Sequence, residues 1–140
     1  MVPSVNTSST CAFVVGTNAY NELLPLKNAV RDAQVVEKEL RQVGVERITS
    51  AFDCTYDQLT QKTNEYLSQL RKGDVAVVFA AAHAAMYQSK HVFLTTNSNE
   101  KNIAHTSLRV ELLLNRSVPF CVLCACAMPI FSMCLSLIHI

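Results

Sequence analysis

The chain has 140 residues, of which half are hydrophobic and 16% are charged. This length and composition predict one folded domain with a substantial core, and they exclude wholesale disorder. Twelve basic and eleven acidic residues give a formal net charge of +1, and Lys and Arg form no long run. The charge pattern therefore indicates no nucleic-acid partner.

Residues 1–10 are rich in Ser and Thr and carry no charged side chain. This segment lacks the basic start and the apolar stretch of a secretory signal, so we interpret it as a flexible lead-in. We expect a cytoplasmic protein whose six cysteines are thiols rather than a disulfide framework. Cys11 and Cys54 lie in or beside predicted strands, which favours a role as small buried hydrophobes.

Strands and helices are predicted to alternate in the first half of the chain. An apolar run over 11–15 predicts a buried parallel strand. Apolar residues at three-and-four spacing predict an amphipathic helix over about 28–43. Residues 47–52 predict a second strand, and Thr55 with Gln58 forms a capping-box pattern that opens a second helix.

The second half continues the same alternation. An uninterrupted apolar run within 74–82 predicts a central parallel strand that is covered on both faces. Residues 91–96 predict a short strand, 107–115 a third helix, and 119–126 another buried strand. This order predicts an α/β domain, over residues 11–130, with a mainly parallel central sheet and helices on both faces.

Reactive groups in such sheets gather just past the carboxyl ends of the strands. Here this rule selects the loop 16–22, His83, Cys124 and Cys126. A thiol becomes a strong nucleophile as a thiolate, and a neighbouring imidazole can hold it in that form. His83 and Cys126 can meet if their strands are neighbours. On the residues alone, however, a structural histidine is the commoner alternative.

Two groups of motifs resemble the caspase, metacaspase and paracaspase family of cysteine peptidases. The first follows the opening strand and consists of Gly16, Tyr20, a Leu-x-x-Pro-Leu-type turn over 23–26, and Asn28, Asp32 and Ala33. The second is RKGDVAVVFAAAHA (71–84), which resembles the family's Gly-Asp, apolar strand and Gly-His-Gly. The resemblance covers about residues 11–129. It implies a three-layer caspase-like fold and a cysteine endopeptidase.

The resemblance also implies a catalytic pair. His83 matches the general base, and Cys126 matches the nucleophile when VLCACA (122–127) is set on the family's Val-Leu-Asp-x-Cys-Arg. Cys124 and Cys121 are alternative nucleophiles, because predicted strand ends slip by a residue or two. The chemistry implied is acyl transfer, with His83 protonating the leaving amine of a protein or peptide substrate.

Two further positions acquire roles from the resemblance. Asp32 matches an acidic position that lines the pocket for the residue before the scissile bond, where it would favour Arg or Lys. The alternative is a solvated Asp32 that pairs with a nearby basic residue. The backbone N–H groups of Cys126 and Ala84 would stabilise the oxyanion. Dimerisation of the full-length protein stays open.

The implied chemistry needs no cofactor. Some metacaspases use calcium, but the sequence shows no acidic cluster that would hold it. The four cysteines of segment 121–134 lack the spacing of a zinc site, so we expect no metal. His91 and His105 lie in no motif and are expected at the surface or in loops.

The sequence departs from the family pattern at several positions. Ala82 and Ala84 replace the two glycines around His83, and each would cost ~1–3 kcal/mol if the backbone there needs a positive φ or a very close substrate approach. Cys124 and Ala127 replace the Asp and Arg of the nucleophile motif. The alternative function is therefore a catalytically inactive caspase-like module that binds or regulates partners.

Residues 117–140 contain no charged side chain and are long enough to span a membrane, so a membrane anchor is a second alternative. Pro119, Pro129 and the absence of basic residues after the run favour a buried strand followed by foreign sequence. The end, LSLIHI (135–140), resembles a translated sequencing-library adapter. We therefore expect no membrane contact and interpret 131–140 as a non-native tail on a truncated domain.

Overall fold

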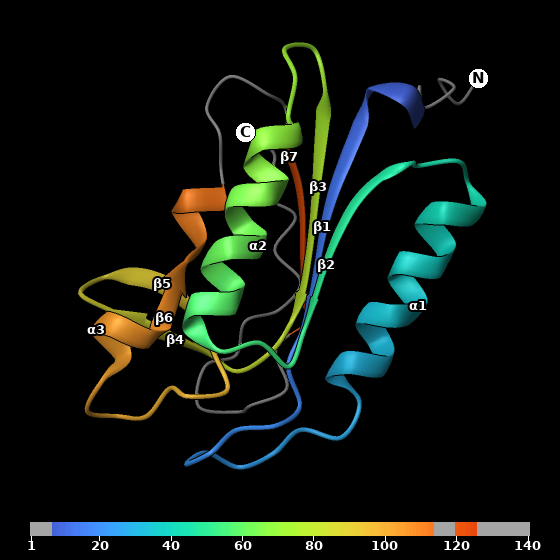
Figure 1. Ribbon diagram of the computed structural model, residues 1–140. Helices are drawn as coiled ribbons and strands as arrows, with labels where there is room; N and C mark the ends of the chain where they lie inside the picture. Colours follow the sequence, from blue (N-terminus) through green and yellow to red (C-terminus); the bar gives the residue numbers. More distant parts are fainter. Residues whose placement is uncertain (1–6, 114–119, 126–140) are drawn as a thin grey trace.

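The computed structural model describes residues 7–113 and 120–125. At its centre lies a sheet with the strand order β2-β1-β3-β7, in which all neighbouring strands run parallel (Figure 1). The strands are β1 (Thr10–Gly16), β2 (Arg47–Phe52), β3 (Val75–Ala81) and β7 (Phe120–Ala125). The predicted parallel sheet and the strands predicted to form it are confirmed.

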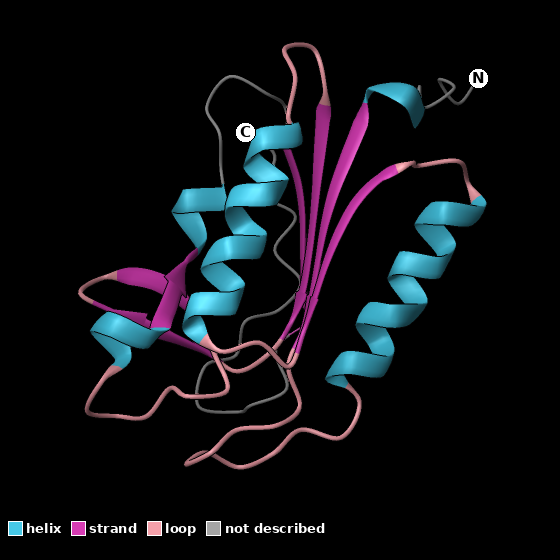
Figure 2. Cartoon of the chain, viewed as in Figure 1, coloured by secondary structure: helices cyan, strands magenta, loops and turns pink. Residues whose placement is uncertain are grey.

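Two long helices lie on opposite sides of this sheet, as Figure 2 shows. They are α1 (Ala29–Gln42) and α2 (Tyr56–Gln69). On one face, Phe13 of β1 stacks on Tyr66 of α2 with ring centroids 5.1 Å apart. On the other face, Val14 packs in one cluster with Ala33 of α1. Because successive strand residues point to opposite faces, the apolar run of β1 can bury both of its sides.

Short sequence signals set where these elements start and stop. The Thr55 side chain accepts the Gln58 N–H at 3.3 Å, and the Gln58 side chain accepts the Thr55 N–H at 3.0 Å. This capping box begins α2, as predicted. Gly16 ends β1 where α1 passes close by. A Cβ atom added at Gly16 would lie 2.8 Å from the Ala33 Cβ and 2.9 Å from the Val30 Cα.

A smaller antiparallel sheet follows β3 and has the strand order β4-β5-β6. Its strands are β4 (Ala84–Tyr87), β5 (Lys90–Leu94) and β6 (Ser107–Arg109). Gln88 and Ser89 connect β4 to β5 with φ values of 49° and 63°, as a tight hairpin of type I′ requires. The sequence predicted a strand over 91–96 but missed β4. Alanine is depleted in strands, and Gln-Ser is not a usual pair for this turn.

The predicted helix over 107–115 is wrong. A short helix α3 (Ile103–Thr106) comes earlier, and β6 is followed by the 3-10 turn η2 (Val110–Leu113). Leu108 pairs with Phe93 of β5, and both side chains are buried in the core. Pairing with the open edge of β5 thus overrides the helical spacing of the segment. The local sequence does not reveal this long-range pairing. His91 and His105 are exposed, as expected.

An ion pair ties the amino ends of the strands together. The Arg47 guanidinium donates to both carboxylate oxygens of Asp74, each at 2.7 Å, and also to the carbonyl oxygens of Gln69 and Ser8. This hydrogen bond from Arg47 lowers the pKa of Asp74. Residues 7–10 of the expected lead-in therefore belong to the fold, as a 3-10 turn and the start of β1.

No helix in the described part of the chain has the length and apolar character needed to cross a membrane. The membrane-anchor alternative depends on segment 117–140, of which the structure describes only 120–125. The expected non-native tail, 131–140, likewise lies outside the described residues.

Candidate active site

The carboxyl ends of three parallel strands meet at one edge of the central sheet. Ala81 at the end of β3 is the register partner of Gly16 in β1 and of Ala125 in β7. The chain continues from β3 through Ala82 to His83, and Cys126 is the residue that follows β7. Cys126 itself lies outside the described residues. The strands that lead to the predicted catalytic pair are nevertheless adjacent.

His83 is held in one orientation, with only 3% of its surface exposed. Its ring Nε2 lies 2.7 Å from the carbonyl oxygen of Leu24. Because a carbonyl oxygen only accepts hydrogen bonds, this contact places the proton of the neutral ring on Nε2. Nδ1 is then the basic nitrogen, and it is buried without a hydrogen-bond partner among the described residues. The orientation and the tautomer of the ring are therefore fixed. Its Nδ1 accepts no hydrogen bond from any described residue.

Tyr20 holds the same histidine from a second side. Its hydroxyl oxygen accepts the backbone N–H of His83 at 2.8 Å, and the two rings lie 4.5 Å apart between centroids. The carbonyl oxygen of His83 accepts the N–H of Leu94 at 2.9 Å. Backbone and side chain of His83 are therefore both anchored, which is the pre-organisation that proton transfer requires.

The loop that supplies the Leu24 carbonyl is anchored in turn. One carboxylate oxygen of Asp53 accepts the N–H groups of Asn18 and Ala19, at 2.8 and 3.0 Å. The side-chain oxygen of Asn18 then accepts the N–H of Val30 at the start of α1, at 3.1 Å. Sequence reasoning assigned no role to Asp53 or to the Leu24 carbonyl. A backbone oxygen has no sequence signature, but an Asp directly after a strand is a common turn signal.

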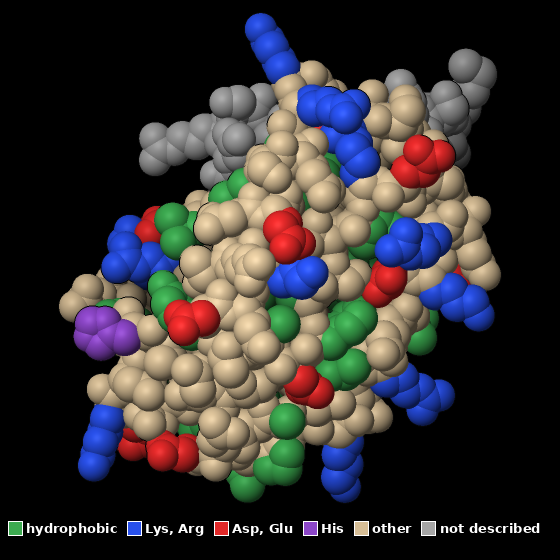
Figure 3. Space-filling view, in the orientation of Figure 1, with side chains coloured by type: hydrophobic (Ala, Val, Ile, Leu, Met, Phe, Trp, Pro, Cys, Tyr) green, Lys and Arg blue, Asp and Glu red, His purple; other side chains and the backbone are tan. Residues whose placement is uncertain are grey.

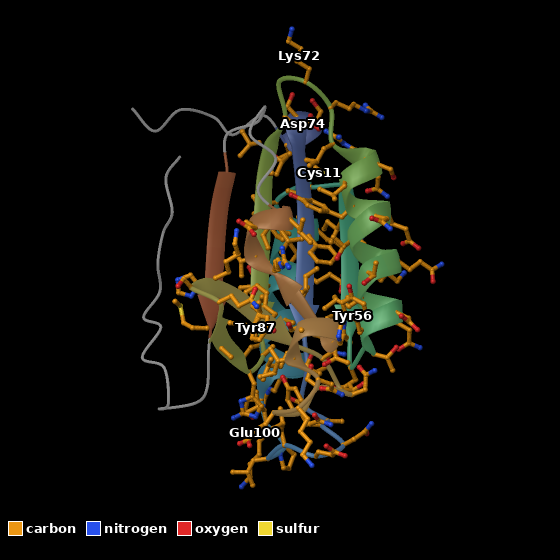
Figure 4. All side chains as sticks on the ribbon, turned by 90° about the vertical axis from the view of Figure 1, so that its left-hand side faces the viewer. Cys11, Tyr56, Lys72, Asp74, Tyr87 and Glu100 are labelled. Atoms are coloured by element: carbon orange, nitrogen blue, oxygen red, sulfur yellow. The ribbon has the colours of Figure 1, made fainter. Side chains whose placement is uncertain are left out.

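A cleft of about 390 Å³ opens beside His83. Its lining is drawn from the loop after β1, from β4 and β5, and from the turn before α3: Glu22, Leu23, Leu24, His83, Ala84, Ala85, Leu94, Asn99, Glu100 and Ile103. Glu100 lies at the opposite end of the molecule from Asp74 (Figure 4). The lower margin of the molecule in Figure 3 carries acidic, basic and apolar side chains. The cleft is thus apolar inside, with acidic residues in its lining.

The family model of the caspase domain matches residues 9–124. The chain belongs to the caspase-domain family. The match to this peptidase family supports a cysteine-peptidase-like function and protein substrates. The match includes His83 and ends two residues before Cys126. Comparison with curated proteins gave no significant match.

The alanines that replace the family's glycines fit without backbone strain. Among the described non-glycine residues, a positive φ occurs at Asp53, Gln88 and Ser89 and not at Ala82 or Ala84. The conformational cost expected if these positions needed a left-handed backbone therefore does not arise in this caspase domain. Strain at the flanking alanines gives no reason to regard His83 as inactive.

Asp32, the predicted acidic pocket residue, lies apart from the cleft. It belongs to the first turn of α1, is exposed, and is not part of the cleft lining. It forms no ion pair with a Lys or Arg of the described residues either. The structure therefore does not bring Asp32 and His83 into one described cavity, and the role of Asp32 in this caspase domain stays a prediction.

The described cysteine side chains do not have the character of nucleophiles. Cys11 is fully buried in β1 and Cys54 is half-buried after β2, and burial raises the pKa of both thiols. The side chains of Cys121 and Cys124 lie outside the description, as does all of Cys126. No group of three potential metal ligands occurs in the part of the chain whose side chains are described.

Proposed function

We propose that this protein is a cysteine endopeptidase in which Cys126 is the nucleophile and His83 the general base. The observation that carries the proposal is the state of His83. Its Nε2 donates to Leu24, its Nδ1 has no partner among the described residues, and it follows the strand that neighbours β7. Consecutive Cα atoms lie about 3.8 Å apart, so this is the distance between the Cα of Cys126 and that of Ala125, the last residue of β7.

The proposed reaction is acyl transfer in two halves. Nδ1 of His83 takes the proton of the Cys126 thiol, and the thiolate attacks the carbonyl carbon of the scissile peptide bond. The C–N bond breaks as the imidazolium returns its proton to the leaving amine. A water molecule, deprotonated by His83, then attacks the thioester, which releases the carboxylate product and restores the thiol. The chemistry requires no metal or cofactor.

The N–H of Ala84 is a suitable oxyanion donor. Ala84 pairs with Phe93, and the neighbouring ladder hydrogen bond runs from the Leu94 N–H to the His83 carbonyl. This alternation makes Ala84 and Phe93 a non-hydrogen-bonded pair, so the Ala84 N–H points away from β5. A donor beside His83 that the sheet does not use supports the role proposed for Ala84, together with the Cys126 N–H.

The strand register bears on which cysteine reacts. Cys121 is the partner of Val77, whereas Cys124 is the partner of Ala80 near the end of β3. At about 3.3 Å per residue, Cys121 lies four residues, or roughly 13 Å, before the end of β7. This separation disfavours Cys121. Cys126 is preferred to Cys124 because it follows the strand end, where loops carry the reactive groups of parallel sheets.

Three further proposals accompany this function. Asp32 would favour Arg or Lys before the scissile bond, by charge pairing. The complete domain would have the three-layer arrangement, which the placement of α1 and α2 on opposite sheet faces supports. The protein would act in the cytoplasm.

The alternative is an inactive caspase-like module. It is favoured by Cys124 and Ala127, which stand where the nucleophile motif of the family has Asp and Arg. It is not favoured by the histidine, because the hydrogen bonds that orient His83 are in place. The two functions therefore differ in whether the thiol at the end of β7 is activated.

Labelling with an irreversible thiol-directed peptide probe tests this difference. In the full-length protein, we expect the probe on Cys126, located by mass spectrometry of the digested protein. His83→Ala should slow labelling on the order of a hundredfold or more, because it removes the base. His91→Ala, a change at an exposed histidine, is the matched control and should label normally. Label on Cys124 would correct the nucleophile, and no label on either would favour the inactive module.

A further inference from the structure

The cleft beside His83 combines an apolar lining with two carboxylates. Leu23, Leu94 and Ile103 contribute to its apolar wall, and Glu22 and Glu100 are the acidic residues of its lining. Both glutamates are exposed, and neither forms an ion pair with a described residue. Lys101 lines an adjoining hollow together with both of them, so the lining there has one basic and two acidic residues.

His83 connects this cleft to the proposed reaction. His83 belongs to the same lining, is almost wholly buried, and has a ring nitrogen without a partner among the described residues. Burying a polar atom without a hydrogen bond is unfavourable. In the proposed reaction this nitrogen takes the proton of the Cys126 thiol and passes it to the leaving amine of the substrate. The acidic residues and the unpartnered histidine thus lie along one cleft.

The wall that carries Glu100 is held in place by its own hydrogen bonds. The side-chain oxygen of Asn102 accepts the N–H of Asn99 at 2.7 Å, and that of Asn99 accepts the N–H groups of Lys101 and Asn102, at 2.9 and 3.0 Å. The turn that presents Glu100 is therefore fixed before any ligand binds, which lowers the entropy lost on binding.

We propose that this cleft binds the leaving-group side of a peptide substrate, with an aliphatic side chain in the apolar part and a Lys or Arg against Glu22 and Glu100. The inference rests on the proposed function. There, His83 protonates the leaving amine, so that amine lies against the histidine. The residues attached to the amine must then enter the cleft that His83 lines. The carboxylates complement a basic residue, and the leucines an aliphatic one.

Binding is tested first without turnover. The isotope-labelled full-length protein is titrated with the amidated peptides Leu-Lys-Gly and Leu-Glu-Gly, and backbone amide shifts are followed by NMR. We expect shifts at Ala85, Leu94 and Ile103, and binding of the Lys peptide about three- to tenfold tighter, as for two exposed ion pairs. The double variant E22Q/E100Q should lose this preference. E39Q/E65Q, which removes two exposed helix carboxylates elsewhere, should keep it.

Turnover separates this inference from the proposed function. One substrate has an amine fluorophore as its leaving group, and two others replace it with Leu-Lys or Leu-Glu. Equal kcat/KM for the Lys and Glu substrates, in a protein that cleaves the fluorophore substrate, would overturn the inference alone. Cleavage of none of the three would overturn the proposed function. The NMR titration would then decide the inference: equal affinities, or shifts outside the cleft, would contradict it.

Discussion

Nε2 of His83 lies 2.7 Å from the carbonyl oxygen of Leu24, which comes 59 residues earlier in the chain. This contact fixes the ring by a backbone group rather than by a carboxylate side chain. Its geometry therefore depends on how well the loop after β1 is held, since no local side chain can compensate for a displaced carbonyl. The residues that anchor this loop, and those that anchor the histidine backbone, are where we expect substitutions to alter the site.

Asp53→Ala should weaken catalysis from a distance. The change removes the acceptor for the Asn18 and Ala19 N–H groups and places alanine at a φ of 48°, which costs about 1 kcal/mol or more. We expect kcat/KM for a fluorogenic peptide to fall several-fold, with slower probe labelling. Asp53→Asn keeps the oxygen and tolerates this backbone, so it should restore most of the rate. Equal loss in both variants would show that the carboxylate charge matters instead.

Tyr20→Phe should remove the hydrogen bond that anchors the backbone N–H of His83. The buried N–H of His83 loses its acceptor, which typically costs about 1–3 kcal/mol of unfolding free energy. The ring contact with His83 is kept, so the fold should survive with a lower denaturant midpoint and a reduced kcat. Tyr87→Phe removes a hydroxyl from the hairpin, where it accepts from the Gln88 side chain at 3.4 Å. It serves as control and should change neither quantity measurably.

Gly16→Ala should displace α1 from the sheet. The new Cβ would lie 2.9 Å from the backbone Cα of Val30, which cannot move without its helix. We expect a loss of about 1–3 kcal/mol in urea unfolding, the usual cost of overpacking. Combining it with Ala33→Gly removes the contact with the Ala33 Cβ but not those with the Val30 Cα and the Ala29 carbonyl oxygen, at 2.9 and 3.0 Å. The double variant should therefore stay destabilised, and full recovery would place the clash at the side chain alone.

The parts of the fold that the sequence predicted are those encoded by short-range patterns. A pattern of only a few residues predicts each of these parts: the apolar runs of β1 and β3, and the Thr55 capping box of α2. The small sheet is different, because β6 forms only by pairing with β5 across an intervening loop and helix. Its segment has helical spacing, and the long-range pairing that wins is not visible locally.

The residues of the candidate site likewise differ in whether a short-range sequence pattern predicts them. His83 could be placed at a strand end from an apolar run and a family motif, and the structure puts it beside the strand that leads to Cys126. Its partners could not be predicted, because one is the carbonyl oxygen of Leu24 and another is a tyrosine hydroxyl 63 residues away. The glutamates of the cleft were also missed, since ordinary exposed Glu residues carry no signal until folding brings them together.

Asp74→Asn should reveal the acid sensitivity of the fold. Asp74 pairs with Arg47 in a part-buried site, with side-chain exposures of 5% and 17%. Removing one hydrogen-bonded charged partner at such a site costs about 1–3 kcal/mol. Arg47 lowers the folded-state pKa of Asp74, so the stabilisation is present above the unfolded-state pKa, near 3.9, and is lost as the pH falls through the folded-state value.

The measurement is urea unfolding of the wild type and of Asp74→Asn from pH 7 down to pH 2. The advantage of the wild type should be constant at neutral pH and should shrink below about pH 4, because protonated Asp74 no longer differs in charge from Asn. Asp57→Asn, a change at an exposed carboxylate in the first turn of α2, is the matched control. A wild-type advantage that persists at pH 2 would mean that Asp74 acts through its hydrogen bonds and not through its charge.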